Sequence, residues 1–316
     1  MSQSPAQANH GNASWHMHAA LMLTMMMWAL NVSLIKWLVD NMDAALSAGL
    51  RMLGAALALV VLLAISVKQW RLFNRRMLAL LSISALLMVY ANQMLFVSAM
   101  PHTTASNASL VLALNPLLTG VLEAFFFKKR LHRQYLLGVA IALVGVCLVI
   151  FNNPKAQFGE PSWGDLMVLG SMLAFALGVM VLQYLSQRKD DMLERPTQLG
   201  LNTFIYVIGS LALLLHAGFS TQGTWAQLSA ISWPMWGVIG ASGILITALG
   251  ALAWGKGVAN IGAGRAGIYM SWVPLMGVGF GAWLLDEALT IWHLYALIAV
   301  VVGTALCNTS PKTTNS

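Results

Sequence analysis

The sequence predicts an all-α integral membrane protein whose ten transmembrane helices form two inverted five-helix repeats. Hydrophobic residues make up 59% of the 316 residues and charged residues only 9%, whereas about a quarter of a soluble domain is charged. The apolar residues form long runs, which are typical of helices that cross a bilayer, because β-barrel strands are short and alternating. The first half of the chain can also be superposed on the second.

Ten apolar runs of about 20 residues, the length that crosses a bilayer, define the predicted helices. The first five lie at 18–39, 44–66, 77–99, 104–127 and 134–151. The second five lie at 164–186, 198–217, 234–256, 261–285 and 289–309. The expected organisation is a cytoplasmic, uncleaved tail (1–17), a first repeat (18–151), a periplasmic linker (152–163), a second repeat (164–309) and a cytoplasmic tail (310–316).

Short basic clusters between the helices predict the orientation. They follow the second, fourth and sixth helices, and they comprise Lys68, Arg71, Arg75, Arg76, Lys128, Lys129, Arg130, Arg133, Arg188, Lys189 and Arg195. Cytoplasmic loops retain Lys and Arg, so we expect a multi-pass protein of a bacterial inner membrane with both termini in the cytoplasm. Because these residues lie on no single face, nucleic acid is not an expected partner. The expected partners are a small-molecule substrate and the lipid bilayer, and the protomer is either a monomer or part of a homodimer.

A shift of 158 residues superposes 104–148 on 262–306 without gaps and places Pro116 on Pro274. Five is an odd number, so the second half enters the membrane inverted, and equivalent loops lie on opposite faces. Their charges are opposite, since Lys128 and Lys129 correspond to Asp286 and Glu287. Inverted repeats with a site near the midplane are typical of secondary transporters.

The chain resembles the drug/metabolite transporter superfamily, and within it the EamA-type permeases. The likeness covers residues 18–309 and rests on the order of several short motifs. These are Trp28, Asn31 and Lys36; Arg51; Gln93-Met94-Leu95-Phe96 with Ala99; the stretch from Ala105 to Pro116; Gly164-Asp165-Leu166; and Arg265, Ala266, Pro274 and Glu287-Ala288-Leu289.

The resemblance implies a substrate cavity lined by helices one to four and six to nine, with the fifth and tenth peripheral. One position departs from the family pattern. Lys129 replaces the glutamate that often follows the fourth helix, whereas Glu287 keeps its counterpart in the second half. We therefore do not assign to this chain any role that a symmetric pair of acidic residues has in the family.

Two arginines lie inside predicted helices. An ionisable group in the bilayer costs a few kcal/mol and is a candidate functional residue. Arg51 and Arg265 are therefore predicted to bind a substrate carboxylate or phosphate, which a guanidinium fork suits. The alternative is that both side chains extend to the membrane interface.

Uncharged polar side chains complete the predicted substrate site. Trp28 and Asn31 share a helical face and suit an amphipathic ligand. Asn92, Gln93 and Asn115 need protein partners or a wet cavity, because lipid cannot satisfy them. Interhelical hydrogen bonding is the alternative role for this set.

Prolines and a polar-aromatic pair mark the fourth and ninth helices. Pro116 and Pro274 remove backbone donors and are predicted to kink their helices, which would present carbonyl groups to a ligand or serve structure alone. Ser271 and Trp272 are also predicted to bind substrate, although the sequence leaves open which face of the ninth helix is turned to the cavity.

The predicted function is export of a small metabolite, an amino acid or a similar amphipathic compound, by alternating access. Exchange of sugar phosphates or nucleotide sugars is the alternative. A membrane-embedded enzyme is less favoured, because no His, Asp, Glu or Cys groups converge at one depth. No cofactor or metal site is predicted. The substrate, transport direction, coupling ion and oligomeric state are left open by the sequence.

Overall fold

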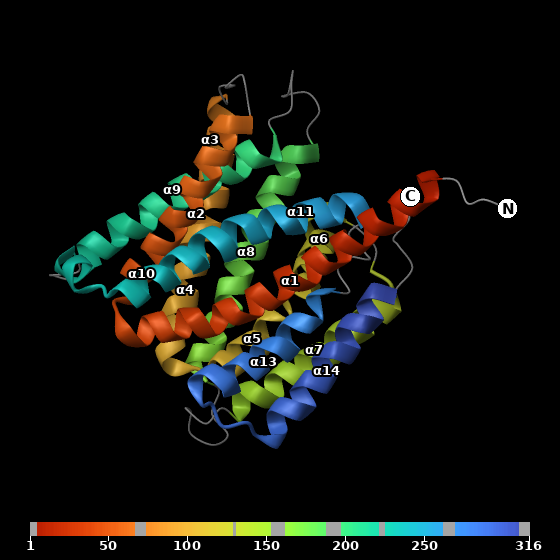
Figure 1. Cartoon of the computed structure of the whole chain (residues 1–316). Coiled ribbons are helices and arrows are strands. Elements are labelled where there is room, and N and C mark those ends of the chain that lie inside the picture. Colours follow the sequence, from red (N-terminus) through yellow and green to blue (C-terminus); the bar gives the residue numbers. More distant parts are fainter. Residues whose placement is uncertain are drawn as a thin grey trace.

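The structure is a computed structural model that describes residues 5–66, 74–128, 131–152, 162–187, 197–220, 225–261 and 269–309. Every regular element in these ranges is a helix. Figure 1 shows a bundle of long, tilted helices, in which α7 and α14 lie side by side along one edge.

The helices of the first half include one span with a π-helical segment and one span with a break. They are α1 (Pro5–Asn41), α2 (Ala44–Ser66), α3 (Arg75–Ala85), the π-helix η1 (Leu86–Ala91), α4 (Asn92–Ala99), the 3-10 turn η2 (Met100–His102), α5 (Ala105–Leu112), α6 (Asn115–Phe127) and α7 (Arg133–Phe151).

The second half also contains a π-helical segment. Its elements are α8 (Trp163–Gln187), α9 (Gln198–Ser220), the 3-10 helix η3 (Trp225–Ala230), α10 (Trp233–Gly240), the π-helix η4 (Ala241–Leu249), α11 (Gly250–Ile261), α13 (Trp272–Leu285) and α14 (Ile291–Thr309).

Eight helical spans among the described residues are long and apolar enough to cross a membrane, and 272–285 and 291–307 are shorter apolar helices. The first eight predicted helices coincide with these eight spans, because about 20 apolar residues in a row are needed to cross the hydrocarbon core. In the predicted helix 261–285, residues 262–268 lie outside the described ranges. The multi-helix membrane fold is confirmed, and the count of ten stays a prediction. One boundary differs clearly, since α1 begins at Pro5 rather than at residue 18.

Many large apolar side chains on the spans are exposed. Phe125, Val144, Leu215 and Trp283 each expose more than half of their surface. Water would not solvate such a surface well. Contact with lipid hydrocarbon explains it.

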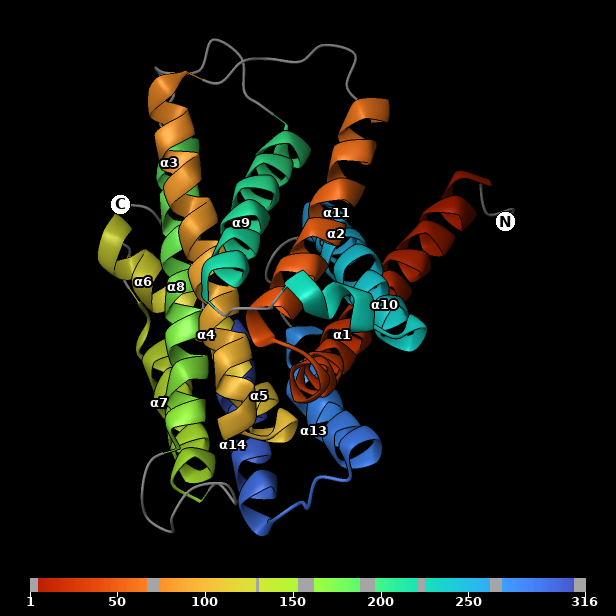
Figure 2. The same ribbon diagram turned by 90° about the vertical axis from the view of Figure 1, so that its left-hand side faces the viewer.

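The two ends of the bundle can be named by their helix junctions (Figure 2). At one, the α2–α3 end, α2 ends while α3 and α9 begin. At the other, the α7–α8 end, α7 ends while α8 and α14 begin. The basic residues Arg75 and Arg76 lie at the α2–α3 end.

Small residues allow α7 and α14 to pack closely. A Cβ atom built on Gly138 would lie 2.5 Å from the carbonyl oxygen of Gly303, and one on Gly145 would lie 2.7 Å from the Cβ of Ala299. Neither position tolerates a side chain without a shift of the helices. The contact therefore depends on glycine, as in many membrane helix pairs.

Two spans share an unusual end. Lys128 follows α6 with a φ of 53° and Asp286 follows α13 with a φ of 51°, and these are the non-glycine residues with positive φ in the described ranges. Left-handed residues commonly end helices, but glycine is the usual choice. The two positions are 158 residues apart, which is the spacing of the predicted repeat.

Candidate functional site

A buried arginine lies at the centre of the candidate site. The side chain of Arg51 in α2 is 1% exposed. Its Nε donates a 2.7 Å hydrogen bond to Oγ of Ser242 in η4, and Nη1 donates to Oε1 of Gln93 in α4 over 3.4 Å. The guanidinium group therefore joins helices of both halves.

Further hydrogen bonds extend from this arginine in two directions. The Ser242 hydroxyl donates to Oδ1 of Asn31 in α1 at 2.5 Å. Gln93 donates to Oδ1 of Asn92 at 2.9 Å, and Asn92 donates to the Ser171 carbonyl of α8, also at 2.9 Å. We call Asn31, Arg51, Asn92, Gln93 and Ser242 the polar network.

The positive charge of the polar network has no carboxylate partner in the described part of the chain. The electrostatic interaction of Arg51 is with Tyr206 of α9, and its second terminal nitrogen, Nη2, forms no hydrogen bond to a described residue. Removing a charge from water without a counter-ion costs several kcal/mol. An anionic ligand would offset that cost, and the planar guanidinium fork matches a carboxylate or phosphate.

Irregular helix geometry positions the polar network. Ser242 lies within the π-helix η4, and Asn92 directly follows the π-helix η1. Gly243 lets η4 approach α2, because a Cβ there would overlap the carbonyl oxygen of Arg51. Short π-helical segments are frequent at functional sites.

An aromatic group lies one helical turn from Asn31. The indole nitrogen of Trp28 donates to the Ile246 carbonyl of η4 at 3.3 Å, and its ring lies 5.8 Å from that of Trp254, centroid to centroid. A Cβ on Gly250 would come within 2.9 Å of the indole nitrogen. The site thus combines a cationic polar part with an aromatic part, an arrangement that suits an amphipathic ligand.

The break between α5 and α6 presents a second polar group. Asn115 begins α6, and its buried Oδ1 atom has no hydrogen-bond partner among the described residues. Pro116 lacks the N–H that would bond the carbonyl four residues earlier. An unsatisfied amide is costly in a membrane-spanning segment, so Asn115 is a second candidate ligand contact.

Glu287 connects the second half to the first at the α7–α8 end. Its carboxylate accepts hydrogen bonds from the backbone N–H of Ala105 at 2.5 Å, from the N–H of Ser106 at 2.8 Å and from the Ser106 hydroxyl at 2.7 Å. These groups open α5, where a negative charge is favoured by the helix dipole. We call this contact the Glu287 cap.

A second buried acid stabilises the same end. Asp165 in the first turn of α8 is fully buried and accepts hydrogen bonds from the Thr103 hydroxyl and, at 3.2 Å, from the amide of Asn107. The Ser162 hydroxyl accepts from the Asp165 N–H at 3.3 Å. Asp165 is a first-turn residue, as the helix dipole favours, and it also fixes the turn between α4 and α5.

The EamA-like transporter family model matches residues 16–151 and again 162–309. Together the two matches span most of the chain. The chain belongs to the EamA-like transporter family.

Several proteins similar to this EamA-like chain are named as transporters or exporters. An uncharacterized transporter, YetK, of Bacillus subtilis is 23% identical over 270 residues, which cover 85% of this chain and 79% of the relative. A probable amino-acid metabolite efflux pump of Salmonella typhimurium is 27% identical over 285 residues, covering 89% and 91%. A probable terminal-alkyne amino-acid exporter of Streptantibioticus cattleyicolor is 24% identical over 256 residues, covering 79% and 80%.

A crystal structure of a protein shares the fold of the EamA-like chain. The TM-score is 0.63 at 16% identity, and the match covers 93% of this chain and 98% of the other. At that identity the likeness concerns the fold alone. It includes nearly the whole of both chains.

The structure brings together four of the predicted substrate-binding residues of the EamA-like protein, namely Asn31, Arg51, Asn92 and Gln93, and places Trp28 beside them. Asn115 and Ser271 are half-buried at helix breaks and form no hydrogen bond with this set. Trp272 is 42% exposed and shares the outer face of α13 with Leu275 and Trp283. Arg265 lies outside the described residues. Helix boundaries lie just before Pro116 and Pro274, where kinks are predicted.

Sequence reasoning missed Ser242 and Tyr206, and it named Glu287 as part of a family motif without predicting its contact with α5. Ser242 lies in an apolar run, where a single serine gives no distinctive signal. Tyr206 and Glu287 gain their significance only from tertiary contacts with Arg51 and α5. The backbone irregularity at η4 also has no clear sequence signature.

Proposed function

We propose that the protein is a secondary transporter that exports a small amphipathic metabolite with a carboxylate, such as an amino acid, by alternating access. The observation that carries this proposal is the buried Arg51, which has hydrogen-bond partners but no carboxylate partner in the described ranges. Membership of a transporter family and relatives named as amino-acid exporters support the same class of cargo.

In this proposal the substrate carboxylate binds the guanidinium group of Arg51. Asn31 and Gln93 already bond to the groups around it and would hydrogen-bond the remaining polar atoms of the substrate. The apolar part of the substrate would contact Trp28 and Trp254. Charge-assisted hydrogen bonds of this kind are about twice as strong as neutral ones.

We further propose that the α2–α3 end faces the cytoplasm of a bacterium and the α7–α8 end faces the periplasm. The basic residues Arg75 and Arg76 support this orientation, because Lys and Arg are retained on the cytoplasmic side. Both termini would then be cytoplasmic. A reporter that fluoresces only in the cytoplasm should therefore be active when it is fused to either terminus.

The two halves are proposed to be inverted repeats. Four correspondences at spacings of about 158 residues support this: the π-helices η1 and η4, the breaks before Pro116 and Pro274, and the left-handed residues Lys128 and Asp286. The fourth is Gly145 with Gly303, which pack between α7 and α14. Each half would then have five spans, ten in all.

The conformation described is proposed to face the cytoplasm. All seven residues from Ala105 to Val111 are buried, whereas in α6 only Leu117 is buried. The Glu287 cap and the close contact of Gly277 and Gly281 with α5 close the periplasmic side. Rocking of the two halves would break these contacts and open that side.

The decisive test is counterflow in proteoliposomes. Vesicles loaded with a mixed pool of amino acids, amines, nucleosides, sugars and sugar phosphates should accumulate a labelled carboxylate-bearing compound faster than empty vesicles. A folded protein that moves no class of compound would contradict the carrier proposal. Uptake of sugar phosphates alone would favour the exchanger instead.

The matched control for this assay is Trp283→Ala. Trp283 is 74% exposed on the outer face of α13 and lies away from the polar network. Its replacement should leave counterflow unchanged. Trp28→Ala, within the site, should alter it without preventing membrane insertion.

A further inference from the structure

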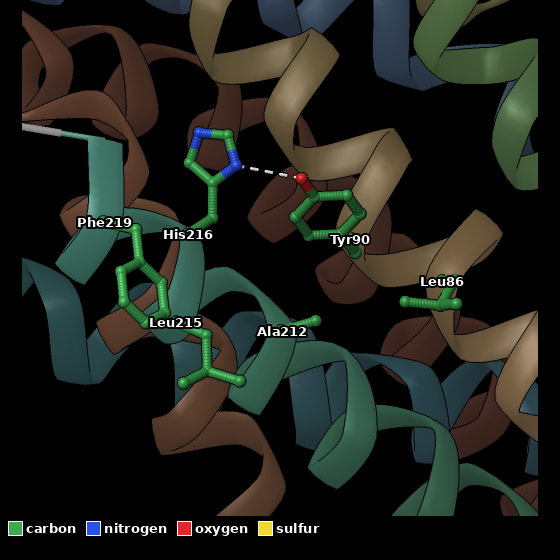
Figure 3. A pocket seen from close by; sticks show the side chains of 6 residues that line it. All are labelled: Leu86, Tyr90, Ala212, Leu215, His216 and Phe219. Atoms are coloured by element: carbon green, nitrogen blue, oxygen red, sulfur yellow. Dashed lines mark hydrogen bonds between the residues drawn. The ribbon is translucent and has the colours of Figure 1, made fainter.

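A pocket of about 460 Å³ lies between η1 and α9 (Figure 3), and none of its lining residues belongs to the polar network. Its lining consists of Leu86, Tyr90, Ala212, Leu215, His216 and Phe219. The volume is within the range of about 300–1,000 Å³ seen for small-molecule sites. The pocket therefore has room for part of an organic ligand.

The helices η1 and α9 are in contact on one side of this pocket, and the pocket lies where they diverge. Two turns before His216, a Cβ on Gly209 would overlap the side chain of Val89, so α9 and η1 are in direct contact there. The mouth of the pocket is apolar, since Leu215 and Phe219 expose 60% and 88% of their surface. In a membrane-spanning segment such residues face lipid, and the bilayer is the medium that reaches the pocket.

One polar pair crosses the pocket. The Tyr90 hydroxyl and Nδ1 of His216 are 2.9 Å apart, and Figure 3 shows this bond linking the two walls. When the tyrosine donates to Nδ1, the proton of the imidazole is on Nε2. Nε2 has no hydrogen-bond partner among the described residues. The pair thus presents one free donor beside an apolar surface.

The polar and apolar parts of the pocket are ordered along the membrane normal. Leu86 and Ala212 each lie four residues before Tyr90 and His216, and both helices run from the α2–α3 end toward the α7–α8 end. The polar pair therefore lies about one turn closer to the α7–α8 end. His216 is four residues, or about 6 Å, from the end of α9.

We propose that this pocket binds a phospholipid of the outer leaflet. An acyl chain would contact Leu86, Ala212 and Leu215, and a glycerol-ester or phosphate oxygen would accept a hydrogen bond from Nε2 of His216. The order of the pocket matches an outer-leaflet lipid, whose polar group lies outward of its chains. A lipid of the inner leaflet would have the opposite order. The inference rests on the orientation given under the proposed function.

The test uses the full-length protein in vesicles of phosphatidylethanolamine and phosphatidylglycerol that contain a phosphatidylethanolamine with a photoreactive diazirine in its acyl chain. After irradiation, adducts are mapped by peptide mass spectrometry. Adducts should concentrate on 86–90 and 212–219, and they should exceed those on the exposed face of α14.

Two variants alter the pocket in different ways. Ala212→Phe fills it, and His216→Leu removes its donor. Each should reduce the adducts about fivefold, as expected for loss of a good contact or of one hydrogen bond. Ile298→Phe, on the exposed face of α14, is the matched control and should leave the adducts unchanged.

The inference is overturned if adducts at the pocket do not exceed those on α14, or if both variants retain them. Ala212→Leu, which fills the pocket with a smaller side chain, serves in place of Ala212→Phe if that variant does not elute as a single species. Crosslinking needs no transport, so its failure is distinct from failure of the carrier proposal. Counterflow by Ala212→Phe shows separately whether the carrier works without the lipid.

Discussion

The polar network and the α7–α14 contact solve the problem of packing helices in lipid in opposite ways. At the polar network, Arg51, Ser242 and Asn31 join three helices through side-chain hydrogen bonds. At the α7–α14 contact, Gly138 and Gly303 bring two backbones together without side chains. The comparison predicts that changes at the polar network affect transport and changes at the α7–α14 contact affect stability, because a charge is costly in the core whereas close packing is favourable.

The largest expected effect is on transport by Arg51→Met. Losing charge-assisted bonds of about 1.5–3 kcal/mol should slow counterflow about 10- to 100-fold. Folding should be unaffected or improved, because a buried charge exchanged for an apolar side chain is often neutral or stabilising. Thermal unfolding and counterflow are measured on the same preparation. Counterflow at the wild-type rate in this variant would contradict a role of Arg51 in transport.

Gly303→Val tests the opposite region. The added side chain would overlap the carbonyl oxygen of Gly138 and should lower the free energy of unfolding by about 1–3 kcal/mol. Counterflow per folded molecule should stay the same. Val302→Ala, at an exposed neighbour, is the control, with an effect within about 0.5 kcal/mol. A stable Gly303→Val with altered substrate preference would show that the two regions are coupled.

Glu287→Gln tests the Glu287 cap, which is charged like the polar network and joins two helices like the α7–α14 contact. Weakening the Glu287 cap by about 0.5–2 kcal/mol should raise the labelling of a cysteine introduced at Ser109 by external thiol reagents several-fold. Asp286→Asn is the control, because asparagine tolerates left-handed φ and the Asp286 side chain forms no hydrogen bond with the described residues of α5. Equal labelling in all three proteins would argue against a periplasmic closure at this contact.

The smallest expected effects come from Ser242→Ala and Asn31→Ala. Both remove the Ser242–Asn31 hydrogen bond, worth about 0.5–1.5 kcal/mol, and should raise the substrate concentration for half-maximal transport a few-fold. Ser242→Ala also removes the bond from Arg51, so its effect should be the larger. Because the Ser242–Asn31 bond is shared, the double variant should be little worse than Ser242→Ala alone. Ser210→Ala is the control, because among the described residues the buried Ser210 hydroxyl bonds its own helix. Fully additive losses would mean that the two residues act independently.

The membrane fold was predictable because hydrocarbon thickness imposes a length on every span. The predicted run 44–66 coincides with α2, and 134–151 differs from α7 by a single residue. The early start of α1 at Pro5 was not predictable, since a polar stretch gives no apolar signal for a helix. The sequence therefore predicts a helix end where the chain leaves the hydrocarbon core, and it does not predict one in a polar segment outside the membrane.

The members of the polar network were easier to predict than their arrangement. Arg51 and Asn31 are costly in lipid, so the sequence marks them as candidates. Their connection through Ser242 depends on η4, where a widened turn follows no residue pattern. Tertiary contacts also give Glu287 its role, because an acid after a helix has many possible partners.

The π-helices η1 and η4 determine the direction in which the side chains that follow them point around the helix axis. Each residue of an α-helix turns the chain by about 100°. If 86–91 became regular α-helix at the same length, the following α4 segment would rotate by roughly that angle, because a π-helical turn holds about one residue more than an α-helical turn. Asn92 and Gln93 would then turn away from Arg51 while the span kept its hydrophobicity. A substitution that no hydropathy profile would notice can thus disconnect the polar network.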